Sequence, residues 1–268
     1  MSNNSIIPVA KVIAIVNQKG GVGKTTTCVN LSASLVAAKR RVLLVDMDPQ
    51  GNATTGSGCE KNEQEYTVCD VLLGKLVITE LIQLMPQAGY YLVPANGGLT
   101  IAEASLLHED LREQRLANAL TLIRHDYDYI LIDCPPSLNM LTINALVAAD
   151  SVLIPMQCEY YALEGLSSLV ETIEILQNSI KPRLRIEGLL RTMYDSRNCL
   201  TQEVTEQLFS YFGDQVFHTV IPRNVRLAEA ASHGLPTLQY DKRSVGAEAY
   251  LALAGELIRR HQQPSEIA

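Results

Sequence analysis

Lys19-Gly-Gly-Val-Gly-Lys-Thr-Thr26 is the stretch of sequence that decides the fold. It follows an almost continuous apolar run from Lys11 to Asn17, which is typical of a strand buried on both faces of a parallel sheet. It leads into the segment from Thr25 to Ala38, where apolar residues recur at helical spacing. A glycine-rich loop between a strand and a helix predicts a phosphate-binding site, because backbone N–H groups and the helix N-terminus then face one anion.

Each residue type in this loop has a physical reason to be there. Three glycines, Gly20, Gly21 and Gly23, allow the backbone to curl around a phosphate group. Lys24 is placed to reach the β- and γ-phosphates of a nucleotide, and the Thr25 hydroxyl is placed to bind Mg²⁺. The loop therefore predicts ATP and Mg²⁺ as cofactors.

The rest of the chain alternates short β-rich runs with longer helical patterns. This alternation predicts an α/β fold of three layers, the P-loop NTPase fold, with a mostly parallel twisted sheet between helices. We expect one domain over residues 1–268, with flexible ends at about 1–10 and 262–268, and a loop from Gly51 to Glu65. Further strands are predicted at Arg41–Asp46, Tyr90–Pro94, Tyr129–Asp133, Ser151–Pro155, Arg185–Leu190 and Val216–Ile221. Further helices are predicted at Glu113–His125, Met140–Ala148, Leu163–Asn178, Thr201–Phe212 and Arg243–His261.

Composition limits the classes of function. Hydrophobic residues make up 47% of the 268 residues and charged residues 19%, which predicts a sizeable core rather than a disordered chain. The net charge of −7 excludes a protein that is basic over its whole surface. The acidity is uneven, since residues 1–180 hold 11 Lys and Arg against 19 Asp and Glu, whereas residues 181–268 hold 11 against 10. The charge count is therefore compatible with a local basic patch in the C-terminal third.

The six cysteines form no C-x-x-C pair and no zinc spacing, so we interpret them as reduced and mostly buried thiols. The N-terminus lacks the pattern of a signal peptide, and the apolar runs end well short of about 20 residues. These features predict a cytoplasmic protein.

Carboxylates follow two of the predicted strands. Asp46 and Asp48 follow the second strand in Val45-Asp-Met-Asp-Pro-Gln-Gly-Asn52, and Asp133 ends the apolar run from Tyr129. An apolar strand that ends in Asp is how P-loop enzymes place a carboxylate near Mg²⁺. We therefore expect Asp133 beside the phosphate loop.

The K-G-G-x-G-K-T form of the loop resembles the deviant Walker A motif of the ParA/MinD family of P-loop ATPases. By this resemblance, Lys19 contacts the phosphates bound by the other subunit of a nucleotide-sandwich dimer, and Lys19, Lys24 and Asp46 are catalytic. The D-x-D-P-Q-G-N segment resembles the family's first switch, in which the residue matching Asp46 activates the attacking water. Asp48 then supports the switch or belongs to the outer magnesium shell. The nucleotide-binding residues implied are Lys19, Gly20, Gly21, Val22, Gly23, Lys24, Thr25 and Thr26, and the metal-site residues are Thr25, Asp48 and Asp133.

The C-terminal third resembles the Soj-like branch of ParA proteins. The stretches that carry this resemblance are Gly188–Arg197, Ile221–Ala230, Ser232–Thr237 and Tyr240–Glu248. The resemblance implies that Pro222 and Asn224 lie against adenine, and that Arg197 and Arg226 bind DNA phosphates without sequence preference. Arg223, Lys242 and Arg243 extend that basic patch.

The expected function is an ATP-dependent DNA-partitioning ATPase. The resemblance implies an ATP-bound homodimer on non-specific double-stranded DNA, a ParB-type centromere-binding protein that stimulates hydrolysis, and a nucleoid-associated location. A related ATPase that positions another cargo is the main alternative. A MinD-like membrane ATPase is disfavoured because the C-terminal segment is interrupted by Pro264, and no membrane partner is expected. An iron–sulfur relative is disfavoured because the cysteine spacing offers no obvious pair of cluster ligands.

Overall fold

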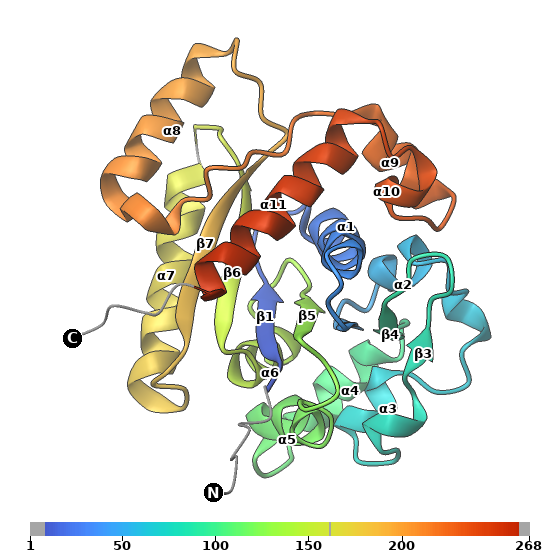
Figure 1. Cartoon of the computed structure of the whole chain (residues 1–268). Helices are drawn as coiled ribbons and strands as arrows, with labels where there is room; N and C mark the ends of the chain where they lie inside the picture. The colour runs from blue at the N-terminus through green and yellow to red at the C-terminus, as the bar shows by residue number, and fades with distance from the viewer. Residues whose placement is uncertain (1–8, 161, 263–268) are drawn as a thin grey trace, which may run out of the picture.

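The computed structural model describes residues 9–160 and 162–262, which contain a sheet of seven strands (Figure 1). Neighbouring strands are parallel except that β3 is antiparallel to β4. In their order across the sheet, the strands are β3 (Gln83–Leu84), β4 (Tyr91–Val93), β2 (Val42–Asp46), β5 (Tyr129–Asp133), β1 (Lys11–Ile15), β6 (Ser151–Gln157) and β7 (Arg185–Thr192).

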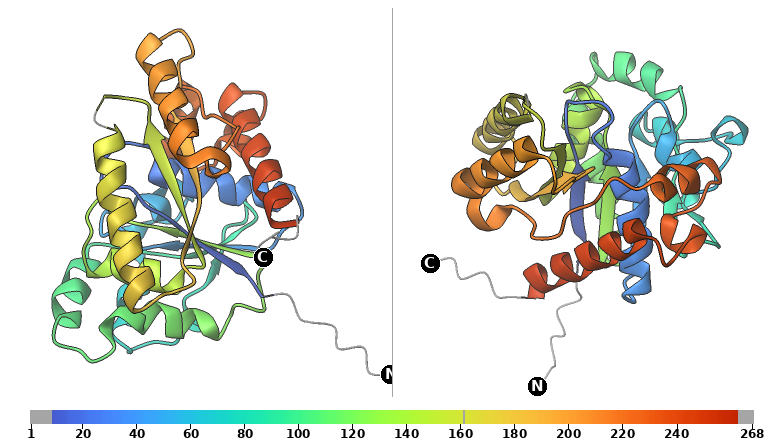
Figure 2. Two further views of the ribbon diagram at one scale, coloured as in Figure 1. Left: turned by 90° about the vertical axis from the view of Figure 1, so that its left-hand side faces the viewer. Right: turned by 90° about the horizontal axis from the view of Figure 1, so that it is seen from above.

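Helices cover both faces of the sheet, so the fold has three layers. Figure 2 shows α7 on one side of the sheet and α11 on the other. The helices are α1 (Lys24–Ala37), α2 (Asn52–Gly56), α3 (Val68–Leu72), α4 (Leu99–Leu106), α5 (Arg115–Thr121), α6 (Met140–Ala148), α7 (Ala162–Ser179), α8 (Cys199–Phe212), α9 (Val225–Ser232), α10 (Thr237–Tyr240) and α11 (Val245–Gln262).

Side-chain alternation along β1 explains the two layers of helices. Successive residues of a strand point to opposite faces. Ile13 and Ile15 therefore pack with the buried faces of α1 and α11, while Val12 and Ala14 pack in a second core that includes α3 to α8. The predicted α/β fold with a mostly parallel sheet is confirmed.

The predicted strand from Val216 to Ile221 is wrong. This segment runs beside β7 but pairs with it only at isolated positions, where the N–H groups of Phe217 and Ile221 donate to the carbonyls of Leu189 and Arg191. Between these positions the ladder is interrupted.

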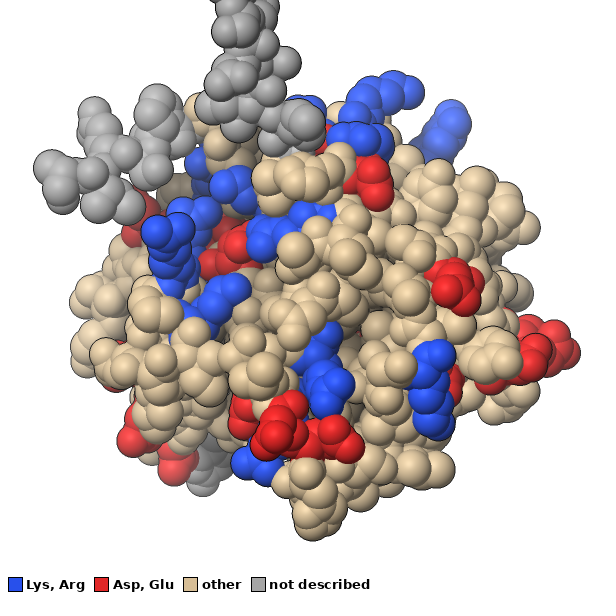
Figure 3. Space-filling model, turned by 90° about the horizontal axis from the view of Figure 1, so that it is seen from below, with Lys and Arg blue, Asp and Glu red and all other residues tan. Residues whose placement is uncertain are grey.

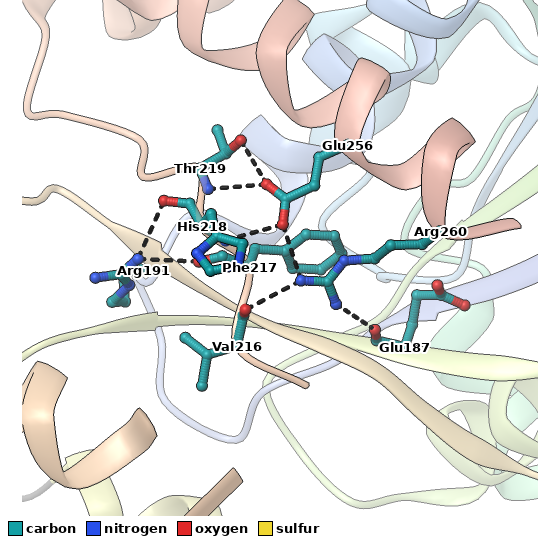
Figure 4. A network of polar contacts seen from close by, with 8 residues as sticks. All are labelled: Glu187, Arg191, Val216, Phe217, His218, Thr219, Glu256 and Arg260. Carbon is teal, nitrogen blue, oxygen red and sulfur yellow. Dashed lines mark hydrogen bonds and ion pairs between the residues drawn. The ribbon is translucent and has the colours of Figure 1, made fainter. Parts of the chain in front are cut away.

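Glu256 of α11 causes the interruption. Its carboxylate accepts hydrogen bonds from the backbone N–H groups of His218 and Thr219, each at 2.9 Å, and from the Thr219 hydroxyl (Figure 4). Arg191 of β7 holds the carbonyls of Phe217 and His218 at 2.9 and 3.2 Å. These backbone groups are satisfied by side chains, so they do not form a strand.

The predicted loop from Gly51 to Glu65 is also wrong, because it contains α2 and a 3₁₀ turn at Lys61–Glu63. Ala53 and Thr54 of α2 are buried, so this segment packs against the sheet. The predicted helix from Glu113 to His125 is shorter, and it is preceded by a 3₁₀ turn that follows a left-handed residue, Leu111.

Five of the six cysteines are buried and Cys199 is exposed, with all six free. The expected flexible ends are about 1–10 and 262–268, and of these, residues 1–8 and 263–268 lie outside the described residues. Ala10 is buried and Gln262 ends α11. Within the ranges described, no helix combines the length and the apolar character needed to cross a membrane.

Candidate active site

The phosphate loop connects β1 to α1 at the carboxyl edge of the sheet. Gly21 and Gly23 have φ values of 74° and 88°, a left-handed backbone that residues with a Cβ rarely adopt. Gly23 stands immediately before α1, so the loop delivers its N–H groups to the N-terminus of this helix. This geometry explains why the sequence needs glycine at these positions.

The two lysines of the loop differ in their surroundings. Lys24 is buried, and its Nζ lies 3.2 Å from the carbonyl oxygen of Lys19 across the loop. Burial lowers the pKa of Lys24, and the nearby Asp133 carboxylate partly opposes this effect. Lys19 is half exposed and forms an ion pair with Glu159, which follows β6. Its ammonium group is thus paired with a residue outside the phosphate loop.

Asp46 and Asp133 end neighbouring strands in the same register, and neither carboxylate is exposed. The Thr25 hydroxyl donates to Asp133 Oδ2 at 2.7 Å, and the Cys28 thiol donates to Oδ1 at 3.4 Å. Burial and then the nearby Asp46 raise the pKa of Asp133 to about 8. Two carboxylates and a hydroxyl therefore meet beside the phosphate loop, and a cation between them and a nucleotide would relieve their repulsion.

Asp46 also fixes the start of α2. Its Oδ2 accepts hydrogen bonds from the N–H and the hydroxyl of Thr54, and its Oδ1 accepts one from the N–H of Asp48. Burial raises the pKa of Asp46 to about 6, and these hydrogen bonds oppose the rise. Asp48 is buried next to it, and its Oδ1 accepts a hydrogen bond from the N–H of Gln50.

No group of three His, Cys, Asp or Glu side chains within the described ranges could hold a metal ion unaided. This agrees with the way Mg²⁺ is bound in nucleotide sites, by one or two protein groups together with phosphates and water. The pair formed by Thr25 and Asp133 fits that pattern.

A pocket of about 350 Å³ opens beside the phosphate loop. Pro222 and Asn224 line it, together with Gly23 and Thr26 of the loop and helix, so residues nearly 200 positions apart in the sequence meet there. Arg223, which the sequence analysis assigns to the basic patch, also lines this pocket. The sequence analysis did not assign the other lining residues to a site, and these are Thr192, Met193, Ile221, Val225, Leu227, Ala228 and Tyr250. Tyr250 carries no motif signal, but it stands on the buried face of α11 and its hydroxyl lies 3.1 Å from that of Thr27.

The predicted DNA-binding arginines form two groups, each around an aspartate. Arg197 forms an ion pair with Asp195 at 2.8 Å, and Arg197 and Arg223 both lower the pKa of Asp195, to about 2. Arg197 makes the larger contribution, through its hydrogen bonds.

The second group surrounds Asp241. Arg226 lies 3.4 Å from this carboxylate and 2.6 Å from that of Glu229, and the backbone N–H of Arg243 donates to Asp241. Arg197, Arg223, Arg226 and Arg243 are all exposed, as is Lys242. A phosphate that bound to the paired arginines would have to compete with the carboxylates beside them.

Lys and Arg side chains are also more numerous in the upper part of the face in Figure 3, with Asp and Glu side chains among them. Lys11 and Arg185 start β1 and β7, and Arg259 and Arg260 lie in the last turn of α11. Basic residues in the last turn of a helix interact favourably with the helix dipole, which gives Arg259 and Arg260 a structural reason to be there. The sequence analysis did not predict this cluster.

Comparison with known proteins places the chain in a family. A family model described as an AAA domain matches residues 10–186. The chain is 54% identical over 247 residues to the sporulation initiation inhibitor protein Soj of Bacillus subtilis, covering 92% of this chain and 98% of that protein. It is 53% identical over 252 residues to the chromosome partitioning protein ParA of Myxococcus xanthus, covering 94% and 89%.

A solved structure agrees over almost the whole chain. A Mycobacterium smegmatis protein described as cobyrinic acid a,c-diamide synthase, with a bound ATP analogue and magnesium, matches with a TM-score of 0.84 at 38% identity. The match covers 95% of this chain and 97% of that one. The phosphate loop, the paired carboxylates and these relatives together show that the chain belongs to the ParA/Soj family of P-loop ATPases.

Proposed function

We propose that this chain is an ATP-dependent DNA-partitioning ATPase whose ATP-bound dimer binds DNA without sequence preference. The observation that carries the proposal is the arrangement of two lysines in one phosphate loop. Lys24 is buried and its ammonium group contacts the loop backbone, whereas Lys19 is half exposed and pairs with Glu159 outside the loop. A half-exposed lysine that exchanged this partner could reach the phosphates of a second subunit, which would make nucleotide binding and dimerisation depend on each other.

The nucleotide would be held by residues that already lie together. The loop from Lys19 to Thr26 would bind the phosphates, with Lys24 on the β- and γ-phosphates. The pocket lined by Pro222 and Asn224 would take the adenine, since it opens beside Gly23 and Thr26.

Thr25 and Asp133 would hold Mg²⁺, with Asp48 in its outer shell. When bound, Mg²⁺ neutralises charge that develops on the phosphates during hydrolysis. Asp46 would orient and activate the attacking water, because it is a buried carboxylate with a raised pKa beside the loop. In the proposed ATP-bound dimer, Lys19 of each subunit would contact the phosphates bound by the other subunit.

DNA would bind to the exposed arginines Arg197, Arg223, Arg226 and Arg243. Phosphate contacts of this kind supply affinity without sequence information. A ParB-type partner would stimulate hydrolysis and release the dimer from the nucleoid, consistent with a loop completed only when two subunits meet.

The test compares wild-type protein with the variant Lys19→Gln. We expect Lys19→Gln to bind ATP but to stay monomeric in sedimentation velocity and to lose ATP-dependent binding to a non-specific DNA duplex. Lys75→Gln removes the same charge from another exposed ion pair, the one with Asp70, and serves as the matched control. DNA binding by wild-type protein that is equally strong with ATP, with ADP and with no nucleotide would overturn the proposal.

A further inference from the structure

The hydroxyl of Thr192 joins the end of β7 to the phosphate loop. Its Oγ1 lies 2.8 Å from the carbonyl oxygen of Val22 in the loop and 3.1 Å from that of Met156 in β6. Thr192 is only 3% exposed, so water does not replace these contacts. A hydroxyl has one proton to donate, so the two carbonyls compete for it.

The next residue, Met193, has a φ of 47°, in the left-handed region that disfavours side chains with a Cβ. The segment keeps this backbone because both neighbours of Met193 are held. Thr192 is tied to Val22, and the N–H of Tyr194 donates to the carbonyl of Ile221 at 3.0 Å. Gln157 also contacts the Met193 sulfur and lies 3.5 Å from the carbonyl of Gly21 in the phosphate loop.

The segment from Thr192 to Tyr194 is connected to both arginine groups, the one around Asp195 and the one around Asp241. On one side the chain continues directly to Asp195 and Arg197, which are paired. On the other side Ile221 leads through Pro222 to Asn224, whose side chain accepts a hydrogen bond from the N–H of Arg226 at 2.9 Å. A shift of Thr192 therefore acts on the backbone that carries Arg197 and, through Tyr194 and Ile221, on the backbone that carries Arg226.

We propose that Thr192 is a positioning residue, through which the phosphate loop sets the arrangement of the two arginine groups. This inference rests on the proposed function, because it explains how a nucleotide in the loop changes the affinity for DNA. When the loop closes around phosphates, the carbonyl of Val22 moves relative to that of Met156, and the hydroxyl proton goes to the nearer one. The Thr192 hydroxyl can thus donate either to Val22 or to Met156. These are the two discrete arrangements that coupling between two sites requires.

The test measures coupling, defined as the ratio of the affinities for a non-specific DNA duplex with and without ATP. Thr192→Val keeps the shape of the side chain and removes the proton. We expect it to lower this ratio, measured at a saturating concentration of ATP so that a change in ATP affinity does not enter it, by about three- to tenfold, the effect of losing one hydrogen bond. Thr192→Ser keeps the hydroxyl and should restore the ratio.

Thr121→Val is the matched control. It removes a threonine hydroxyl that donates to the carbonyl of Ala117 at 2.9 Å within α5. Its coupling should equal that of wild-type protein. The role of Thr192 would be overturned if Thr192→Val had the same coupling ratio as wild-type protein. It would also be overturned if the ratio of Thr192→Ser were as low as that of Thr192→Val. Absence of ATP-dependent DNA binding in wild-type protein would instead overturn the proposed function itself.

A second measurement needs no variant. In hydrogen exchange of wild-type protein without DNA, a non-hydrolysable ATP analogue should slow exchange of the amides of Tyr194 and Ile221, which hold the two segments together. The proposal would be contradicted if the analogue protected the phosphate loop but left the exchange of the Tyr194 and Ile221 amides unchanged.

Discussion

The Thr25 hydroxyl donates a hydrogen bond to Asp133 at 2.7 Å and so joins the first turn of α1 to the end of β5. The two residues are 108 positions apart in the sequence. A parallel sheet brings them together because β1 and β5 are neighbours and end at the same edge. The fold itself therefore arranges the two residues that we propose as the magnesium side of the site, which would lower the cost of binding.

Asp133 makes the stability of the nucleotide-free protein depend on pH. Its pKa of about 8 lies above the ordinary carboxyl value of 3.8, so the folded protein holds a proton that the unfolded chain releases. The free energy of unfolding should therefore fall as pH rises from about 4 to about 8, by roughly 2–5 kcal/mol.

Asp133→Asn should remove most of this dependence of the free energy of unfolding on pH. In urea unfolding without Mg²⁺, the variant should be more stable than wild-type protein at pH 8 and close to it at pH 5. Parallel pH profiles for the two proteins would show that Asp133 is not the group responsible.

Asp46 should be needed for hydrolysis and dispensable for ATP binding. Asp46→Asn keeps the side-chain shape and loses the base, so the hydrolysis rate should fall about 100-fold or more while the ATP-bound dimer stays on DNA. Thr54→Val removes a hydrogen bond to Asp46 but keeps its carboxylate, and it should hydrolyse ATP faster than Asp46→Asn. Rapid turnover by Asp46→Asn would contradict the assigned role.

The ion pair between Arg226 and Glu229 should weaken DNA binding. Glu229→Gln removes the nearer of the two carboxylates beside the guanidinium group and leaves Asp241 in place. It should raise the affinity of the ATP-bound protein for DNA about two- to threefold, because an exposed pair contributes little. Arg226→Gln should lower the affinity and reduce the slope of log K against log salt by about 1. Glu171→Gln, an equal change of charge on α7, separates this effect from net charge, and an equal gain in that variant would count against the pair.

Glu256 should stabilise the C-terminal layer. Glu256→Ala leaves the N–H groups of His218 and Thr219 without their acceptor and removes the ion-pair partner of Arg260, which keeps only its bonds to backbone carbonyls. This loss should cost about 3 kcal/mol in urea unfolding. Glu248→Ala, on an exposed position of the same helix, should cost less than about 0.5 kcal/mol. Similar losses in the two variants would show that the network contributes little.

Much of the fold could be predicted from local signals. The apolar runs that end at Asp46 and Asp133 and the glycines before Lys24 are features of short segments, and the structure places them at one edge of the sheet. Because strand, loop and helix signals agreed there, the phosphate loop and its carboxylates were found without a structure.

What could not be predicted depends on contacts between distant residues. The segment from Val216 to Ile221 has the pattern of a strand, but Glu256 on another element captures its backbone. The contacts of Thr192 with Val22 and of Lys19 with Glu159 join residues 170 and 140 positions apart. No local pattern reports such contacts, because they exist only after the sheet has formed.

The most direct test of the account is the affinity for a non-specific DNA duplex at fixed salt, measured with and without ATP for wild-type protein and Lys24→Ala. Lys24 lies buried in the phosphate loop, whereas the exposed arginines assigned to DNA lie on other elements. The account predicts tight binding only by wild-type protein with ATP, and weak binding by Lys24→Ala in both conditions. Equal binding by Lys24→Ala and wild-type protein in the presence of ATP would contradict it.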